Sequence, residues 1–380
     1  FEKFRTNLLS KGQLKTIWHL GSRAFAQLTG PTVQVVAFAL KNQPLLTARP
    51  TFVKADSGAA AAKIQSLHDP AKRYSVFSSA DFLSFPGSRL AYWISNETRA
   101  TFLAKDTMKS VLSPRQGMAT SDNGRFLRFW WEVSEGGVER GAASAEDAKK
   151  SGRKWFPYNK GGAPVRWYGN DHFVVNWEDD GRELLDYAAS LYGSPTRTIK
   201  NISLYFRKGI TWGDITFKNR AGEESFAARL SPGGFIFDVK GSSGFPDDDH
   251  LFPVLCLLNS KVLRSFMGFL NPTMTFQVGD IAQVPVVMPR EKFQLVSNGV
   301  ELVKASRMNW GAYEATNNFQ SLPLLTASSE PTPTLESSYT AWITENKDTI
   351  AEMKQLEENN NKLFIDAYGL ADELTPDVPI

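Results

Sequence analysis

The sequence predicts an α+β protein made of three parts. Short apolar and β-branched runs separated by Gly, Pro, Asn and Asp occupy residues 114–290 and are typical of strands joined by loops. In residues 331–380, apolar residues recur instead at helical spacing. Residues 1–45 contain two strand-like runs, which are too few to fold alone. We therefore expect the remnant of an α/β sheet, a β-rich domain and a C-terminal helical segment.

The N-terminal segment, residues 1–45, is predicted to be the edge of a larger sheet. Residues 14–20 form one strand-like run, and residues 32–40 form a continuous apolar and β-branched run that is typical of a buried strand. A Gly-Pro turn at 30–31 joins them, and the other strands of the sheet would precede Phe1. Because the chain starts with Phe rather than Met and shows no signal segment, we expect a cytoplasmic fragment of a longer protein.

The composition predicts a soluble protein with several cores. A chain of 380 residues, 42% of them hydrophobic, can bury two or three cores, and no apolar run approaches the roughly 18 residues of a membrane span. The single cysteine, Cys256, cannot form an internal disulfide, and its leucine neighbours predict a buried, inert thiol. Residues 46–113 include an Ala-rich patch and helix-compatible segments, and we interpret them as a connector to the β-rich domain at 114–290.

The C-terminal segment, residues 291–380, is predicted to be helical around a linker at 323–335. The apolar residues of its last helix recur at helical spacing: Ile343, Ile350, Met353, Leu356, Leu363, Phe364 and Ala367. Gly369 stands where a helix terminator belongs. We expect this helix to pack against a helical segment at 291–305, and a coiled-coil dimer is the alternative use of its apolar stripe.

The charge distribution is uneven. Residues 331–380 hold ten acidic and three basic residues, so that this tail carries −7 and the rest of the chain +10. Residues 197–240 alone carry eight Lys or Arg against four acids. A basic body with an acidic tail suits a polyanionic ligand, and the alternative for the basic segment is a solvated strand face.

One stretch, residues 117–133, combines turn residues, short polar side chains, arginines and aromatic residues. Together with residues 235–244 and 271–281, it resembles the target-recognition region of adenine-specific DNA methyltransferases of BREX phage defence (PglX-type) and of related restriction–modification methylases. Residues 1–40 and 358–376 resemble the flanking parts of the same family. The resemblance implies the closing edge of a methyltransferase domain at 1–45 and a target-recognition domain for double-stranded DNA at 114–290. It also implies other defence proteins as partners and gives no reason to expect a membrane.

The chemistry of that family is absent from this chain. Its catalytic Asn/Asp-Pro-Pro-aromatic motif, which binds a flipped adenine, does not occur, and neither does its Gly-rich cofactor turn after a first strand. The resemblance therefore implies a fragment that is inactive alone and holds no cofactor, with S-adenosylmethionine bound by the parent protein. Residues 247–250, three Asp and one His, form the one cluster that could attract a metal, although a solvated turn is the commoner use of such a run.

Candidate DNA-binding residues are assigned by chemical type. The candidates for phosphate contacts are Lys154, Lys160, Arg207, Lys208 and Lys240. The candidates for base edges or the adjoining backbone are Thr120, Asp122, Asn123, Arg125, Ser242, Ser243 and, towards adenine, Gln277. Tyr158 and Trp212 are the aromatic residues for which we expect exposure. For the polar residues the alternative is ordinary turn chemistry, and for the aromatic residues it is core packing.

Three functions remain open at this level. The leading hypothesis is DNA sequence recognition for an S-adenosylmethionine-dependent adenine methyltransferase. A second is a protein-interaction scaffold that uses the acidic tail and the long helix. A third is a metal-dependent nuclease that uses the loop from Asp247 to His250.

Overall fold

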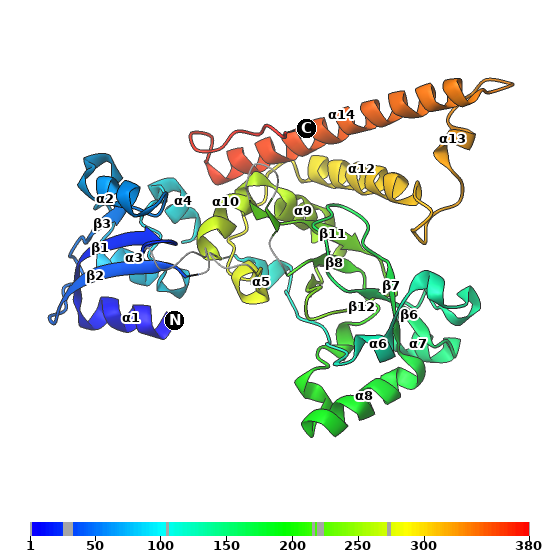
Figure 1. Ribbon diagram of the computed structural model, residues 1–380, viewed down its shortest axis with the longest axis horizontal. Coiled ribbons are helices and arrows are strands. Elements are labelled where there is room, and N and C mark those ends of the chain that lie inside the picture. Colours follow the sequence, from blue (N-terminus) through cyan, green and yellow to red (C-terminus); the bar gives the residue numbers. More distant parts are fainter. Residues whose placement is uncertain are drawn as a thin grey trace. The chain divides into compact units, whose positions relative to one another are not determined.

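The computed structural model describes residues 2–25, 33–103, 106–214, 217–218, 224–271 and 275–379, with only the backbone at 217–218 and 224–225. The predicted Gly-Pro turn and residues 272–274 lie outside the described residues. The chain divides into two compact units, Phe1–Ala104 (unit 1) and Lys105–Ile380 (unit 2), and both contain helices and sheets (Figure 1). The α+β class is therefore confirmed.

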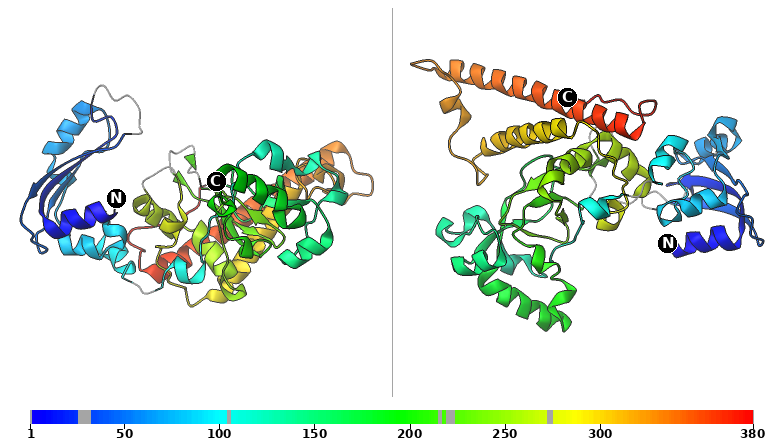
Figure 2. Two further views of the ribbon diagram at one scale, coloured as in Figure 1. Left: turned by 90° about the horizontal axis from the view of Figure 1, so that it is seen from below. Right: turned by 180° about the vertical axis from the view of Figure 1, so that it is seen from behind.

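Unit 1 is a four-stranded sheet covered by helices. Its strand order is β2-β1-β3-β4, in which β1 pairs antiparallel with β2 and parallel with β3. The strands are β1 (Gln13–Gly21), β2 (Val35–Lys41), β3 (Thr51–Lys54) and β4 (Arg73–Tyr74). The helices are α1 (Glu2–Lys11), α2 (Ala60–His68), α3 (Ser79–Ser84) and α4 (Asn96–Thr101) (Figure 2). The interpretation of residues 46–113 as a connector is corrected, because β3 and β4 complete this sheet.

The core of unit 1 joins these segments. Phe52 of β3 stacks on Tyr92 with ring centroids 4.5 Å apart, and both pack with Ile17 of β1 and Leu9 of α1. The segment at 46–103 therefore contributes four of the seven buried residues of this core, namely Phe52, Phe77, Phe82 and Tyr92. The two predicted strands are present and pair antiparallel, and β1 has a further sheet partner, β3, within this chain.

Strand β2 differs from its prediction in burial. Its sequence is continuously apolar, yet Val36, Phe38 and Leu40 are all exposed. The reason is position: β2 is the outer strand of the sheet, and the helices of unit 1 pack on β1 and β3 instead. Apolar periodicity does not distinguish a buried central strand from an exposed edge strand.

Unit 2 contains two small sheets and a separate two-stranded pair. The first has the order β12-β6-β7-β5, in which β12 is parallel to β6, and the second has the order β11-β8-β13. The strands are β5 (Leu127–Phe129), β6 (Trp155–Asn159), β7 (Phe173–Asn176), β8 (Gly209–Trp212), β11 (Ala228–Ser231), β12 (Ile236–Phe237) and β13 (Ser243–Gly244), with a separate pair β9 (Phe217–Lys218) and β10 (Glu224–Ser225).

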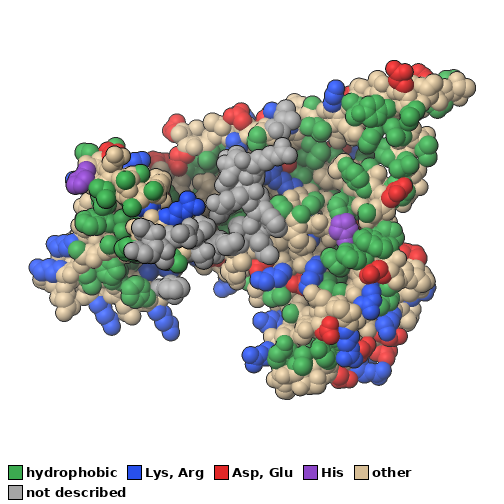
Figure 3. All heavy atoms as spheres, in the orientation of Figure 1, with side chains coloured by type: hydrophobic (Ala, Val, Ile, Leu, Met, Phe, Trp, Pro, Cys, Tyr) green, Lys and Arg blue, Asp and Glu red, His purple; other side chains and the backbone are tan. Residues whose placement is uncertain are grey.

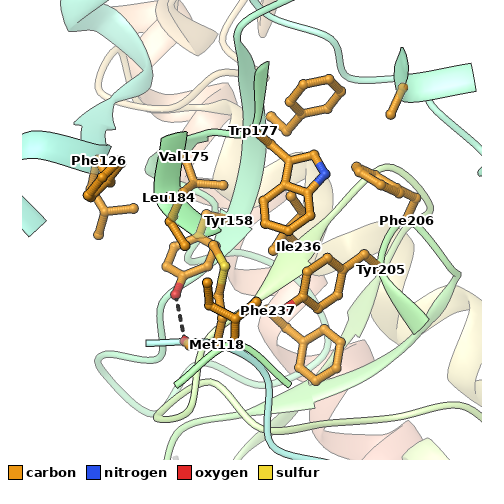
Figure 4. Close-up of a cluster of buried hydrophobic side chains, with 14 of the residues drawn as sticks. Met118, Phe126, Tyr158, Val175, Trp177, Leu184, Tyr205, Phe206, Ile236 and Phe237 are labelled. Atoms are coloured by element: carbon orange, nitrogen blue, oxygen red, sulfur yellow. Dashed lines mark hydrogen bonds between the residues drawn. The ribbon is translucent and has the colours of Figure 1, made fainter. Parts of the chain in front are cut away.

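Aromatic side chains form the core behind the first sheet. Tyr158, Trp177 and Phe237 meet from three different segments and pack against Leu184 of α8 (Glu178–Tyr192) (Figure 4). Gly181 of α8 has φ 75°, and a Cβ atom there would lie 2.6 Å from the Trp177 ring. A residue with a side chain at this position would displace the Trp177 ring, so the close packing of α8 on the core requires glycine here.

The remaining helices of unit 2 include the predicted long one. They are α5 (Met108–Val111), α6 (Asn123–Phe126), α7 (Ala145–Ser151), α9 (Asp248–Asn259), α10 (Lys261–Leu270), α11 (Val278–Ile281), α12 (Lys292–Gly311), α13 (Pro323–Thr326) and α14 (Leu335–Tyr368). Short 3-10 turns occur at Pro70–Lys72, Pro86–Ser88, Trp130–Glu132, Glu135–Gly137, Pro195–Arg197 and Ile202–Leu204.

Helix α14 lies beside α12 in all views, as the sequence predicted (Figures 1 and 2). A buried hydrogen bond of 2.9 Å from Asn298 Nδ2 to Asn360 Oδ1 joins the two helices. Gly369 caps α14 with φ 67°, which confirms the predicted terminator. The short helix α13 stands within the predicted linker at 323–335.

Both helices contact the loop between β6 and β7. Glu357 of α14 accepts hydrogen bonds from Trp167 Nε1 at 2.7 Å and from Arg166 Nη1 at 2.9 Å. Trp310 of α12 donates to Asp171 at 2.6 Å. Burial raises the pKa of the Asp171 carboxyl. The helical segment is therefore part of the same unit as the sheets, not an appendage.

Within the described segments, no single helix is both long enough and apolar enough to cross a bilayer. Helices α9 and α10 reach the required hydropathy only as a pair that is bent by 67°.

Candidate nucleic-acid interface

Three loops of unit 2 converge at one edge of its sheets. Lys160 directly follows β6, Asp238 follows its parallel neighbour β12, and Asp214 follows β8. Because β13 runs antiparallel to β8, Lys240 lies opposite Asp214 at this same edge. We name Lys160, Asp214, Asp238 and Lys240 the lysine–carboxylate cluster.

Glycines bring these loops into contact. A Cβ atom on Gly161 would lie 2.6 Å from the carbonyl oxygen of Lys240, and one on Gly241 would lie 2.1 Å from that of Asn159. Gly161 also has φ 87°, which side chains rarely adopt. The backbones that carry the two lysines are therefore packed directly against each other.

Asp238 organises one half of the cluster. Its Oδ2 accepts hydrogen bonds from Tyr158 Oη at 2.7 Å and Lys160 Nζ at 2.6 Å, and its Oδ1 accepts one from the Lys240 backbone N–H at 2.6 Å. Burial, together with the nearby carboxylate, raises the pKa of Tyr158 well above its ordinary value. The phenol therefore stays protonated, and its one hydrogen is shared between Asp238 and the Met118 carbonyl oxygen, which lies 3.0 Å from the hydroxyl.

Asp214 organises the other half. Its Oδ2 accepts a hydrogen bond of 2.9 Å from Lys240 Nζ. The β8–β13 register places Trp212 and Ser242 on the same face of this strand pair as Asp214. Among the described residues, Trp212 Nε1, Ser242 Oγ and Asp214 Oδ1 are buried side-chain atoms without a hydrogen-bond partner.

The turn before β5 lies next to this cluster. Asn123 is exposed, and its Oδ1 accepts hydrogen bonds from Thr120 Oγ1 at 2.7 Å and Lys160 Nζ at 3.4 Å. Asp122 caps α6 by accepting from the Arg125 backbone N–H at 3.0 Å. Thr120 itself is buried, so its expected contact with base edges is corrected: its hydroxyl fixes the turn.

Five of the candidate positions face inward. Tyr158 and Trp212 are core residues, Ser243 pairs within the sheet as part of β13, and Ser242 and Thr120 are buried beside them. Their expected exposure to DNA is wrong, because short strands continue through segments whose composition is typical of loops.

Two basic candidates pair with acids of α8. The Arg125 guanidinium lies 2.7 Å from Glu183 and holds the pKa of that carboxyl below its usual value. Lys154 Nζ lies 3.4 Å from Glu178. Both side chains are well exposed, and their acidic partners offset their charge.

Arg207 and Lys208 lie elsewhere, at the start of β8, whereas Asp214 follows its end. They line an open cavity of about 480 Å³ together with Phe206, Gly233, Asp247 and Asp248. The Arg207 guanidinium lies over the Phe245 ring, and Lys208 Nζ is 3.6 Å from the exposed Asp248. The structure therefore divides the predicted phosphate contacts between separate places.

Gln277 is exposed just before α11, and its side-chain amide donates to Thr275 Oγ1 at 2.9 Å. The structure brings it next to Asp214, since the backbone N–H of Phe276 donates to the Asp214 carbonyl at 2.7 Å. This side chain is available to a ligand on the side of the lysine–carboxylate cluster.

Sequence reasoning missed the two carboxylates. In the sequence, Asp214 and Asp238 are simply two of the four acidic residues in the basic segment 197–240. The Asp-x-Lys spacing at 238–240 was a usable signal, because a carboxylate two residues before a lysine can hold the intervening turn.

The sequence also did not predict how the aromatic residues in and after β5 stack on one another. Phe129 stacks on Trp131 with centroids 4.6 Å apart and on Phe173 with centroids 4.8 Å apart, and Trp131 is half exposed.

The acidic loop before α9 has a structural explanation. Asp247 caps α9 by accepting hydrogen bonds from the His250 backbone N–H at 2.9 Å and from its ring Nδ1 at 2.6 Å. The hydrogen bond from His250 lowers the pKa of Asp247. Among the residues with described positions, no three His, Cys, Asp or Glu side chains are grouped to hold a metal. Cys256 is buried, as predicted, and burial raises the pKa of its thiol.

Two curated proteins are similar to this chain over nearly its whole length. One is the adenine-specific methyltransferase PglX of Lacticaseibacillus casei (strain Zhang), 33% identical over 370 residues, which are 94% of this chain and 30% of that protein. The other is the adenine-specific methyltransferase BrxX of Escherichia coli O9:H4 (strain HS), 29% identical over 99% of this chain and 29% of that protein. The resemblance to PglX-type methyltransferases is confirmed. No protein-family model matches the chain.

The chain thus spans about 30% of the length of these relatives. Among solved structures, the type IIL restriction–modification enzyme MmeI in complex with DNA matches with a TM-score of 0.47 and 11% identity, over 96% of this chain and 44% of that one. The type IIG restriction endonuclease BpuSI matches with a TM-score of 0.28.

Proposed function

We propose that this chain is the DNA-recognition portion of an adenine-specific DNA methyltransferase of phage defence or restriction–modification. The similarity to PglX over 94% of the chain carries the proposal. In unit 2, the convergence of exposed polar side chains from separate loops supports it, because loops fixed on a rigid sheet are the usual carriers of recognition.

The methyl transfer itself is proposed for the rest of the protein. The sequence contains no Asn/Asp-Pro-Pro-aromatic motif and no Gly-rich turn after a first strand. These are the elements that bind the flipped adenine and the S-adenosylmethionine cofactor in such enzymes. We therefore assign to this chain the binding and orientation of double-stranded DNA, and to the parent protein the cofactor and the chemistry.

The test is a fluorescence-anisotropy titration of the whole chain with a pool of random duplexes at two salt concentrations. Binding should weaken steeply with salt, because phosphate contacts release counterions. The variant Arg207→Ala/Lys208→Ala should bind all sequences more weakly by the same factor, since both side chains are exposed and lie outside the lysine–carboxylate cluster. A folded sample that fails to bind at low salt would refute the proposal.

A protein-interaction scaffold is the second candidate, and one observation favours it. Hydrophobic side chains are exposed where α13 and α14 meet the connecting loop, among them Leu325, Leu335 and Tyr339 (Figure 3). Exposed apolar patches mark protein-binding surfaces. Under this alternative, Leu325→Glu would abolish capture of a defence-system partner while DNA binding stays unchanged.

A further inference from the structure

We propose that Lys160 and Lys240 read guanine edges in the major groove and do not act as phosphate contacts. The inference rests on the proposed role of unit 2 in DNA recognition and deepens it, because it names the residues that select the sequence and the base they select.

The charge of each lysine is offset within the protein. Lys160 Nζ lies 2.6 Å from Asp238 and Lys240 Nζ lies 2.9 Å from Asp214, and each carboxylate side chain is only 1% exposed. A buried carboxylate requires a partner, so these ion pairs persist in the free protein. Affinity from phosphate contacts depends on the release of counterions by unpaired cations. A lysine that is already neutralised by a carboxylate therefore adds little to the salt-dependent affinity.

The direction of each ammonium group is fixed. The Lys160 side chain is 27% exposed and that of Lys240 is 54% exposed, so that both reach solvent while a buried acid holds them. The Lys160 ammonium has a second acceptor in Asn123. Holding a long side chain in its bound conformation removes the entropy cost of ordering it on binding. A directed donor of this kind is suited to reading a base, which requires geometry more than charge.

The chemistry of the donor selects the base. An ammonium group donates hydrogen bonds and accepts none. In the major groove, guanine presents two adjacent acceptors, O6 and N7. Adenine places an amino donor beside its N7, cytosine presents an amino donor, and thymine presents one acceptor, O4, beside a methyl group. Because the loops of the two lysines touch at Gly161, we expect guanines at neighbouring positions of the recognised sequence.

The alternative is that the lysines only neutralise Asp214 and Asp238. The two explanations differ in what happens when the ion pair is opened. A neutralising lysine affects the stability of the fold and hence the binding of all sequences alike. A reading lysine affects the preference among bases, and once freed it should behave as an ordinary phosphate-binding cation.

The experiment selects duplexes from a randomised library with the whole chain and sequences the bound fraction. Asp214→Asn keeps the shape of the side chain and frees Lys240. We expect the preference for guanine at one position to fall about ten-fold or more. The slope of log affinity against log salt should steepen by up to about 0.9. The double variant Asp214→Asn/Lys240→Gln should shift that position towards adenine, because a Gln amide pairs with adenine N6 and N7.

The matched control is Asp180→Asn, which opens the exposed 2.8 Å ion pair between Asp180 and Lys149. It should leave the selected sequence unchanged. Circular dichroism confirms folding of every variant. If the wild-type chain selects no sequence, the proposed recognition function falls and this inference falls with it. If the wild type selects a sequence that both cluster variants retain, or that Asp180→Asn alters equally, the inference is overturned and the recognition function stands.

Discussion

At the scale of single residues, Asp238 is the point on which the candidate interface depends. It receives hydrogen bonds from the Tyr158 hydroxyl, the Lys160 ammonium and the Lys240 backbone. Three donors on one buried carboxylate link the aromatic core to both loops of the cluster. Asp238 therefore links the polar surface to the hydrophobic core by hydrogen bonds.

Tyr158→Phe should measure this coupling. It removes the hydroxyl that bonds Asp238 and the Met118 carbonyl oxygen and leaves the ring in place, so we expect a loss of about 1–3 kcal/mol in the free energy of unfolding, obtained by urea denaturation. Tyr187→Phe is the control, because that ring also packs on the core while none of the described residues forms a hydrogen bond with its hydroxyl. Equal stability losses in the two variants would contradict the role of the Tyr158 hydroxyl.

The residues of the site were predictable only in part. Asn123, Lys160 and Lys240 could be found from the sequence, because short polar and basic residues next to glycine indicate exposed loops. Ser242 and Trp212 were misplaced, since strands as short as β13 leave no periodic pattern that would reveal burial. The partners Asp214 and Asp238 depend on register between strands distant in sequence, which composition does not encode.

At the scale of elements, helix α8 offers a comparison of two glycines in the same conformation. Gly181 near its start and Gly193 at its end have φ of 75° and 74°. A Cβ atom at Gly181 would meet the Trp177 ring at 2.6 Å, whereas nothing lies within 4 Å of one at Gly193.

Gly193→Ala should therefore cost about 1–2 kcal/mol of stability, the strain of a left-handed backbone alone. Gly181→Ala should cost a further amount of about 1–3 kcal/mol, because the methyl group overpacks the core. Thermal denaturation of both variants measures the difference. Identical melting temperatures of the two variants would show that the Trp177 ring can move aside for the methyl group without loss of stability.

The exposed strand β2 makes a second prediction at this scale. Phe38 of β2 is 48% exposed, whereas Phe52 of β3 in the same sheet is 1% exposed. Phe38→Arg should leave the fold intact and reduce self-association, because an exposed apolar edge promotes pairing between chains. Phe52→Arg should unfold unit 1. Sedimentation velocity measures self-association and circular dichroism measures folding. If the Phe38→Arg variant self-associates as the wild type does, β2 is not the strand through which chains pair.

Elements were predictable in proportion to their length. Helix α14, with 34 residues, and the strands β1 and β2 followed from the spacing and the run length of apolar residues. Strand β4, with two residues, and the parallel pairing of β1 with β3 did not, because parallel partners are joined by a long crossover that leaves no local signature.

At the scale of the whole molecule, the two units differ in charge. Residues 1–104 hold thirteen Lys or Arg and five Asp or Glu, whereas residues 105–380 hold thirty and thirty-five. Unit 1 therefore carries +8 of the +10 that the sequence placed in the body of the chain. Unit 2 carries the lysine–carboxylate cluster, whose charges cancel in pairs.

This division predicts a separation of affinity from specificity. Long-range attraction to DNA scales with unpaired positive charge, so unit 1 should supply most of the salt-dependent binding and unit 2 most of the sequence preference. Replacing the exposed Lys11, Lys15 and Lys41 of unit 1 by Gln should flatten the slope of log affinity against log salt by up to about 2.7. The selected sequence should not change.

The complementary measurement uses residues 106–380 alone. Because the core of unit 2 is built from its own residues, this piece should fold, as circular dichroism would show. It should select the same sequence as the whole chain with weaker and less salt-sensitive binding. A piece that keeps the full salt slope would show that Arg207, Lys208 and other cations of unit 2 supply all of the phosphate contacts, and that the positive charge of unit 1 adds nothing to DNA binding.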